Sequence, residues 1–226
     1  MIDLRLGDFR EHLPSLRAAP IAVTITDPPY NVGFKNYDIY RDDLSDEAYI
    51  ELLRASGAWR TVMIAPPATT MRYVVPALGV PTHTGVWCYN SNIPNQFRLI
   101  NYFGLKPDYT RERQPYKEDS KKTRAMKAKG YAGARLYEWW ADIQIVKNTS
   151  REKAHPCPIP LRLAERLVLL CSEPGNLIFD PFMGSGTVAE ACVRLGRSFV
   201  GCELSATYLA EAQRRVAKAQ AAQITR

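Results

Sequence analysis

The chain has 226 residues, of which 46% are hydrophobic, and it carries a formal net charge of +7. This length can bury one sizeable core but is short for two independent domains. We expect neither membrane insertion nor secretion, because no apolar run approaches the roughly twenty residues of a membrane span and the N-terminus does not read as a secretory leader. The five scattered cysteines and three dispersed histidines indicate reduced thiols and no metal site.

Apolar runs and amphipathic stretches alternate along the chain. Strands are expected near residues 2–6, 21–26, 61–65, 82–89, 142–147, 177–179 and 199–203, and helices near residues 45–56, 68–78, 161–171, 187–195 and 206–221. This alternation predicts an α/β fold with a doubly wound, mostly parallel sheet and helices on both faces. We expect one domain over residues 1–226, without internal repeats.

The expected strand over residues 21–26 ends in Asp27-Pro28-Pro29-Tyr30. Two consecutive prolines cannot continue a helix or pair in a ladder, so they stiffen the exit loop and leave carbonyls unpaired. A tyrosine beside a strand-end carboxylate and a proline carbonyl forms a pocket that can stack a flat ring and accept hydrogen bonds from its amino group. The alternative interpretation is a proline-rich turn with a surface tyrosine.

A second junction between strand and loop reads Phe179-Asp180-Pro181-Phe182-Met183-Gly184-Ser185-Gly186-Thr187. Its glycines allow a ligand to approach the backbone, and the next helix offers unpaired N–H groups. No lysine follows the glycines, so this is not a phosphate loop. Glu203 ends the next strand, about twenty residues later, where an acidic residue typically binds the ribose hydroxyls of an adenosine. The alternative is an ordinary strand–helix–strand unit whose glycines permit close packing.

Together, the two segments resemble the motifs of S-adenosylmethionine-dependent DNA amino-methyltransferases. DPPY is similar to their catalytic motif and DPFMGSGT to their cofactor loop, and the order of the two resembles the beta group of the family. Further similar segments are Gly7-Asp8, residues 42–49, His155-Pro156 ahead of residues 161–167, and residues 195–210. One departure is residues 155–160, which read HPCPIP where the family usually has HPTQKP, so the lysine is missing.

The resemblance implies a Rossmann-like methyltransferase sheet with an antiparallel strand pair, around Val86 and Ile143, and a small inserted target-recognition region over residues 91–140. It implies that the catalytic residues are Asp27, Pro28, Pro29 and Tyr30. It implies that S-adenosyl-L-methionine is held by Asp8, Asp27, His155, Pro156, Asp180, Phe182, Gly184, Ser185, Gly186, Thr187, Glu203 and Leu204. Asp8 and Glu203 are expected at the adenosine, and residues 180–187 at the methionine end.

Most of the excess positive charge lies in residues 106–135, where ten basic minus four acidic residues leave +6. The basic residues are Lys106, Arg111, Arg113, Lys117, Lys121, Lys122, Arg124, Lys127, Lys129 and Arg135. Interleaved or flanking aromatic residues are Tyr102, Phe103, Tyr109, Tyr116, Tyr131 and Tyr137. We expect the cations to bind DNA phosphates and the rings to support a displaced base. The alternative is a solvated, partly disordered insertion.

The function implied by the resemblance is methylation of adenine N6 in DNA after base flipping. Cytosine N4 is the alternative within the family, because the aspartate of DPPY favours adenine while enzymes acting on cytosine more often carry serine there. RNA or protein amide methylation and a non-catalytic DNA-binding protein are the alternatives from other classes. The resemblance is compatible with a homodimer and with a restriction endonuclease partner. We expect a cytoplasmic protein, encoded by a bacterium or a phage.

Overall fold

The computed structural model describes residues 1–91, 96–146 and 155–224. Its centre is an eight-stranded sheet in the order β1-β10-β9-β2-β3-β5-β4-β8. These strands are β1 Ile2–Leu6, β2 Ile21–Thr26, β3 Thr61–Ala65, β4 His83–Cys88, β5 Phe97–Phe103, β8 Trp139–Trp140, β9 Leu177–Asp180 and β10 Ser198–Glu203. The pairs from β1 to β3 are parallel, while β5 runs antiparallel to both of its neighbours. The expected α/β fold with a mostly parallel sheet and an antiparallel pair is thus confirmed.

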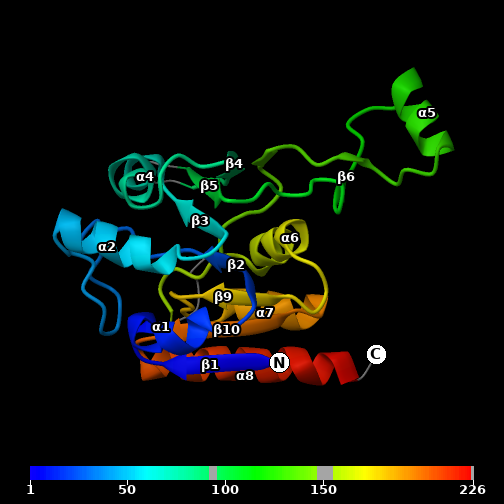
Figure 1. Cartoon of the computed structure of the whole chain (residues 1–226). Helices are drawn as coiled ribbons and strands as arrows, with labels where there is room; N and C mark the ends of the chain where they lie inside the picture. The colour runs from blue at the N-terminus through cyan, green and yellow to red at the C-terminus, as the bar shows by residue number, and fades with distance from the viewer. Residues whose placement is uncertain (92–95, 147–154, 225–226) are drawn as a thin grey trace.

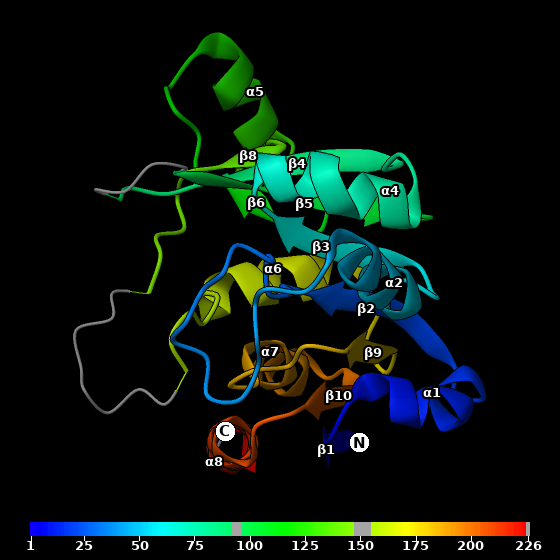
Figure 2. The same ribbon diagram turned by 90° about the vertical axis from the view of Figure 1, so that its left-hand side faces the viewer.

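Helices cover both faces of this sheet (Figure 2). One face packs against α6 Leu161–Cys171, α7 Thr187–Leu195 and α8 Ala206–Ile224. The other packs against α1 Phe9–Arg17, α2 Asp46–Ser56 and a helical run of α3 Pro67–Thr69, the π-helix η1 Thr70–Val74 and α4 Val75–Leu78. Every residue of β3 is buried, as expected for a strand covered on both faces. Among the described residues, no helix is long and apolar enough to span a membrane.

Local sequence accounts for several helix ends. The side chain of Ser45 accepts a hydrogen bond from the backbone N–H of Ala48, and Asp46 and Glu47 lie at the positive end of α2. Gly57 follows the last residue of that helix. At the start of α7, Gly186 adopts a left-handed φ of 77°, and a Cβ there would lie 2.7 Å from the Cβ of Ala212. This close approach lets α8 pack against the beginning of α7.

The strand predictions differ from the structure in the middle of the chain. β5, which was not predicted, supplies the antiparallel partner of β4, whereas the predicted partner around Ile143 is not a strand. Instead, β8 pairs with β4 in parallel, and the carbonyl of Ile143 accepts a 2.7 Å hydrogen bond from the indole of Trp87. Lys147, the last residue of that predicted strand, lies outside the described residues. The predicted insertion over residues 91–140 therefore contains two strands of the main sheet, β5 and β8.

Residues 104–138, which we call the basic arm, leave the sheet after β5 and return to it at β8. The arm contains β6 Arg113–Gln114 and β7 Ala134–Arg135, which pair with each other, and α5 Lys121–Ala128. Figure 1 shows α5 projecting away from the layers of the body. Neither α5 nor α1 was predicted from the sequence. The arm thus presents a short helix at a distance from the central sheet.

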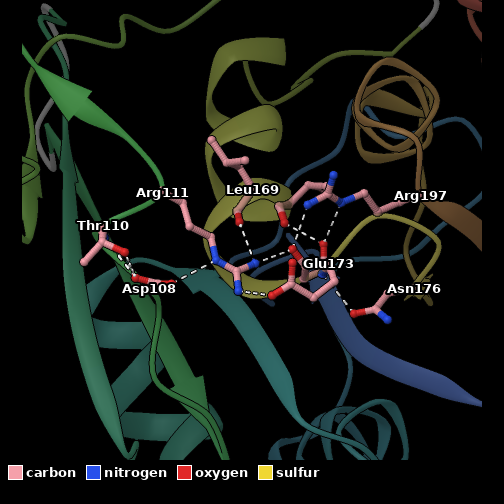
Figure 3. A network of polar contacts seen from close by, with 9 residues as sticks. Asp108, Thr110, Arg111, Leu169, Glu173, Asn176 and Arg197 are labelled. Carbon is pink, nitrogen blue, oxygen red and sulfur yellow. Dashed lines mark hydrogen bonds and ion pairs between the residues drawn. The ribbon is translucent and has the colours of Figure 1, made fainter. Parts of the chain in front are cut away.

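Two arginine networks fix the base of the arm to α6. Arg111 donates to Asp108, to the carbonyl of Ser172 at 2.6 Å and to Glu173 (Figure 3). In the second network, the side chain of Arg166 on α6 is 2% exposed and pairs with Glu112 of the arm at 2.6 Å and with Asp142 at 2.7 Å. A buried guanidinium with two carboxylate partners resists displacement, because pulling the arm away would leave the desolvated charge of Arg166 without these partners. The root of the arm is therefore fixed to the body.

Candidate active site

Adjacent strands bring the two sequence motifs together. β2 and β9 pair in parallel, with Thr24 opposite Phe179, so their carboxyl ends open on the same edge of the sheet. At this edge lies a cavity of about 560 Å3. Its walls include all of the predicted catalytic and cofactor-binding residues except Asp8 and Gly186. The cavity brings these residues together, and the individual roles assigned to them stay predictions.

Asp8 and Gly186 are not part of the cavity wall. Asp8 caps the N-terminus of α1, where its carboxylate accepts hydrogen bonds from the backbone and the side chain of Arg10. These bonds lower the pKa of Asp8 below its ordinary value. Gly186 lies at the start of α7 against Ala212, where the absence of a side chain allows close helix packing, and its contact with the cofactor stays a prediction. Sequence spacing alone did not distinguish these positions from the cavity wall.

The DPPY segment forms one wall of the cavity. The hydroxyl of Tyr30 donates a 2.6 Å hydrogen bond to Oδ1 of Asp27, and the hydroxyl of Tyr49 donates to the carbonyl of Pro29. Within the described residues, no donor contacts the carbonyl oxygen of Pro28. Burial raises the pKa of Asp27 to about 6, against the opposing effect of the Tyr30 hydrogen bond and the charge of Arg98. At neutral pH this carboxyl is therefore mostly ionised and can accept hydrogen bonds.

The glycine loop forms another part of the cavity wall. Asp180 is buried and accepts from the hydroxyl of Thr26 at 2.7 Å and from the N–H of Phe182 at 3.1 Å. Burial raises its pKa to about 7. The carboxylate of Glu203 accepts 2.8 Å hydrogen bonds from the N–H groups of Gly184 and Ser205. These bonds hold the loop after β9 to the end of β10, while the remaining lone pairs of Glu203 stay available for further donors.

His155 packs against the glycine loop. A Cβ on Gly184 would lie 2.8 Å from Nε2 of His155, and the imidazole ring is 4.7 Å from the ring of Tyr208. Burial lowers the pKa of His155 to about 4, so the imidazole is neutral at neutral pH. Cys157, Pro158 and Ile159, which stand where HPTQKP has its threonine, glutamine and lysine, line the same cavity.

Some residues of the cavity were not predicted from the sequence. Arg98 on β5 and Tyr89 after β4 line the wall beside Asp27, and Phe34 and Tyr37 come from the segment that follows DPPY. Arg98 could have been found only together with β5, whose pairing brings residue 98 beside the DPPY wall. The segment over residues 31–44 is held by Asp42, whose carboxylate accepts from three backbone N–H groups of that segment.

The predicted DNA-binding residues fall into two groups. Eight are exposed: Lys106, Lys117, Lys121, Lys122, Arg124, Lys127, Lys129 and Arg135. Arg111 and Arg113 are half-buried, and Arg111 is engaged in the network at α6. Of the aromatic residues expected to contact DNA, Tyr102, Phe103 and Tyr109 are buried in the core. Their burial contradicts a direct contact with a displaced base.

An exposed aromatic pair lies at the edge strand β8 instead. Tyr137 is 39% exposed and Trp139 is 50% exposed, and their rings stack with an interplanar angle of 11°. The ammonium group of Lys117 lies 5.1 Å and 5.3 Å from the two ring centres. A cation over a stacked aromatic pair is a favourable arrangement. Trp139 was not among the candidates taken from the sequence.

Comparison with known proteins gives the family. The DNA methylase family of N6 and N4 methyltransferases matches residues 80–214, more than half of the chain. The chain is 26% identical over 224 residues to the type II methyltransferase M.HpaI of Haemophilus parainfluenzae, covering 90% of this chain and 70% of that protein. It is 24% identical over 236 residues to M.BglII of Bacillus subtilis, covering 90% of this chain and 65% of that protein. It spans about two thirds of the length of these relatives.

Solved structures share the fold. TTHA0409 of Thermus thermophilus, solved in complex with S-adenosyl-L-methionine, has a TM-score of 0.63 at 22% identity, covering 97% of this chain and 96% of that one. The cytosine-N4-specific PvuII DNA methyltransferase has a TM-score of 0.61 at 17% identity, covering 95% of this chain and 86% of that one. The doubly wound sheet and the cavity between its two motif loops define a Rossmann-like methyltransferase. The chain belongs to the N6/N4 DNA methylase family, whose members take their methyl group from S-adenosyl-L-methionine.

The cavity fits such a cofactor. Its volume of about 560 Å3 lies within the roughly 300–1,000 Å3 typical of pockets for small ligands. Gly184, with a left-handed φ of 53°, leaves the loop backbone without a side chain where a Cβ would meet His155. Glu203 and the neutral imidazole of His155 both line the cavity beside that loop and supply polar atoms. The residues present therefore suit a ligand with an adenosine and an amino acid end.

Proposed function

We propose that this chain methylates the N6 amino group of adenine in DNA. The observation that carries the proposal is the common cavity, which is lined both by Asp27 and Pro28 and by the glycine loop that follows β9. One wall suits a base with an amino group and the other suits the methyl donor. Transfer between two ligands held in one cavity needs alignment above all, and alignment can lower a barrier substantially.

The target nitrogen is a weak nucleophile, because its lone pair is delocalised into the ring. The carboxylate of Asp27 and the carbonyl of Pro28 would accept its two N–H hydrogen bonds and direct the lone pair toward the methyl group. Tyr30 would stack on the base. The nitrogen becomes positively charged on methylation, and its proton can then pass to the carboxylate of Asp27 or to water.

For the cofactor, we propose the glycine loop and the residues beside it. S-adenosyl-L-methionine supplies a methyl group activated by a sulfonium. Glu203 would accept hydrogen bonds from the ribose hydroxyls, and residues 180–187 would contact the methionine end through backbone groups. His155 stays neutral and so adds no positive charge to the cavity that would hold the sulfonium.

The basic arm is proposed as the surface that binds DNA. Its exposed cations would neutralise phosphates, and a flipped base costs a few kcal/mol that such contacts offset. The Lys117–Tyr137–Trp139 cluster is an exposed platform on which a base can stack. A Trp139→Ala variant should bind DNA more weakly, by about 1–3 kcal/mol, with unchanged cofactor affinity. Equal DNA affinity in fluorescence anisotropy would contradict the platform.

Cytosine N4 is the second candidate target, because the family comprises both activities and the cytosine-specific PvuII enzyme shares the fold. Asp27 at the first position of the motif favours adenine. A homodimer and a restriction endonuclease partner are proposals that follow from the family alone.

Labelled methyl transfer tests the proposed function. Wild-type protein should transfer label from S-adenosyl-L-methionine to duplex DNA and not to RNA. Asp27→Ala should lose transfer by at least about a hundredfold while it still binds the cofactor in calorimetry, because alignment of the nucleophile is lost. Label in RNA alone, or normal turnover by Asp27→Ala, would rule out the proposal.

A further inference from the structure

Arg98 connects the antiparallel part of the sheet to the DPPY wall. Its guanidinium carbon lies 5.3 Å from the ring centre of Tyr30 and 5.5 Å from that of Tyr89. Its Nε donates a 3.3 Å hydrogen bond to the hydroxyl oxygen of Tyr30, which in turn donates to Oδ1 of Asp27 at 2.6 Å. Three side chains from β5 and the DPPY loop thus form a chain of hydrogen bonds that ends at the carboxylate.

We propose that Arg98 is a positioning residue for methyl transfer, which acts through Tyr30 to keep the carboxylate of Asp27 charged and correctly oriented. The proposal rests on the proposed function, in which Asp27 accepts a hydrogen bond from the target amino group. Arg98 belongs to neither sequence motif, and it reaches the cavity only because β5 lies between β3 and β4.

The direction of the hydrogen bonds follows from the chemistry of the groups. A guanidinium can only donate, so the hydroxyl oxygen of Tyr30 is the acceptor for Arg98. The single O–H of Tyr30 is then free to point at Oδ1 of Asp27. Oδ2 has no hydrogen-bond partner within residues 1–91, 96–146 and 155–224. Arg98 thereby fixes one oxygen of the carboxylate and leaves the other for the amino group.

The positive charge of Arg98 also favours the ionised form of Asp27. Tyr30 and Arg98 are the groups that act most strongly on the carboxyl of Asp27. The other titratable groups around it come from the elements that border the cavity: Asp180 at the end of β9, Tyr37 and Asp42 after DPPY, Tyr49 on α2, Tyr89 after β4, and Cys157. Burial raises the pKa of Asp27 to about 6, and Arg98 and the Tyr30 hydrogen bond oppose this rise. Loss of the guanidinium should therefore raise the pKa further, so that more of the carboxyl is protonated at neutral pH.

A purely structural role for Arg98 makes a different prediction. If Arg98 only packed between the rings of Tyr30 and Tyr89, its replacement would lower activity equally at every pH. If it acts on Asp27, the acid limb of the rate profile moves to higher pH. Arg98→Lys separates charge from geometry, because lysine keeps the charge but loses the planar fork.

Two readouts on the full chain test the proposal. The first is the pH dependence of kcat for methyl transfer to DNA, and the second is 13C NMR titration of the Asp27 carboxyl in the free protein, assigned with Asp27→Asn. We expect Arg98→Met to move both the acid limb and the carboxyl titration up by about one pH unit. Arg98→Lys should move them less, and Lys218→Met, which removes an exposed charge on α8, should leave the titration unchanged.

Tyr30→Phe provides a second route to the same conclusion if Arg98→Met does not fold. It removes the connecting hydroxyl, so the titration of Asp27 should again move up. Combining it with Arg98→Lys should cost less in kcat than the product of the single losses. An unmoved titration in Arg98→Met, or in Tyr30→Phe if Arg98→Met does not fold, would overturn the proposal. The NMR readout needs no methyl transfer, so an inactive wild-type protein would refute the proposed function without deciding the role of Arg98.

Discussion

The hydroxyl of Thr26 donates a 2.7 Å hydrogen bond to Oδ1 of Asp180. Both residues are buried, and they lie on the neighbouring strands β2 and β9 that lead into the two motifs. Asp180 also accepts from the N–H of Phe182, so one carboxylate connects the DPPY strand to the glycine loop. This contact sets the position of the two walls of the cavity relative to each other.

Thr26→Val should destabilise the protein, because the buried carboxylate of Asp180 loses a donor while it stays desolvated. We expect the free energy of unfolding at pH 8 to fall by about 1–3 kcal/mol. Thr24→Val is a matched control on the same strand, since the buried hydroxyl of Thr24 has no hydrogen-bond partner among the described residues. Urea unfolding measures both variants, and equal losses would contradict the account of this contact.

Asp180→Asn should change how stability depends on pH. Burial raises the pKa of Asp180 from 3.8 to about 7, so between these values the folded chain binds more protons than the unfolded chain. Stability from this group therefore falls as pH rises from about 4 to 7. We expect the free energy of unfolding of Asp180→Asn, relative to wild type, to increase over that interval and to level off above pH 7. A difference that is constant from pH 4 to 8 would contradict the raised pKa.

Gly184→Ala should impair cofactor binding. Gly184 has a φ of 53°, and an added Cβ would lie 2.8 Å from Nε2 of His155. Gly175→Ala is the control, because Gly175 also has a positive φ, of 83°, but no atom lies within 4 Å of its added Cβ. Both should lose roughly 1–2 kcal/mol of stability through left-handed strain.

Only Gly184→Ala should also bind S-adenosyl-L-methionine at least about tenfold more weakly, a change that calorimetry resolves. Equal affinity of the two variants would separate Gly184 from the cofactor site.

Arg111→Ala and Lys122→Ala should affect different properties. Arg111 bonds Asp108, Ser172 and Glu173, so its loss should lower the melting temperature. Lys122 is exposed on α5, and its loss should leave stability unchanged but weaken DNA binding and reduce the salt slope by about one. Calorimetric melting and salt-dependent anisotropy measure the two effects. Lys122→Ala with unchanged DNA affinity would argue against α5 as a DNA contact.

Much of the parallel half of the fold could be predicted from the sequence. β2, β9 and β10 are short apolar runs that end at Asp27, Asp180 and Glu203, and the carboxyl ends of neighbouring parallel strands share one edge. The two motifs were therefore expected in one cavity without knowledge of any distance. The family match and the sheet order agree with that expectation.

Strand β5 and helices α1 and α5 were not predicted because each lacks the usual sequence signal of its type. β5 contains Arg98 and Asn101, which interrupt its apolar pattern. Asn101 can be buried there because its side-chain amide donates to the carbonyl of Met63 and to the hydroxyl of Thr70. Pro14 lies inside α1, where a proline usually argues against a helix. In α5, Thr123 is buried and the neighbouring side chains are largely exposed, so no apolar stripe marks that helix.

The same reasons limited the prediction of the site. Arg98 and Tyr89 reach the cavity only through the antiparallel pairing of β5, which the sequence did not predict. Asp8 was expected at the adenosine from a short similarity; in the structure it caps α1 and bonds Arg10, and its contact with the cofactor stays a prediction. Residue type and spacing located the motifs, but the partners of each side chain depend on tertiary pairing.

The identity of the methylated nucleoside tests the central claim most directly. DNA incubated with the protein and labelled S-adenosyl-L-methionine would be digested to nucleosides and separated by chromatography with mass detection. Because Asp27 opens the DPPY motif, we predict label in N6-methyladenine, and none when Asp27→Ala replaces the wild type. Label in N4-methylcytosine alone, or no label in DNA, would contradict the account.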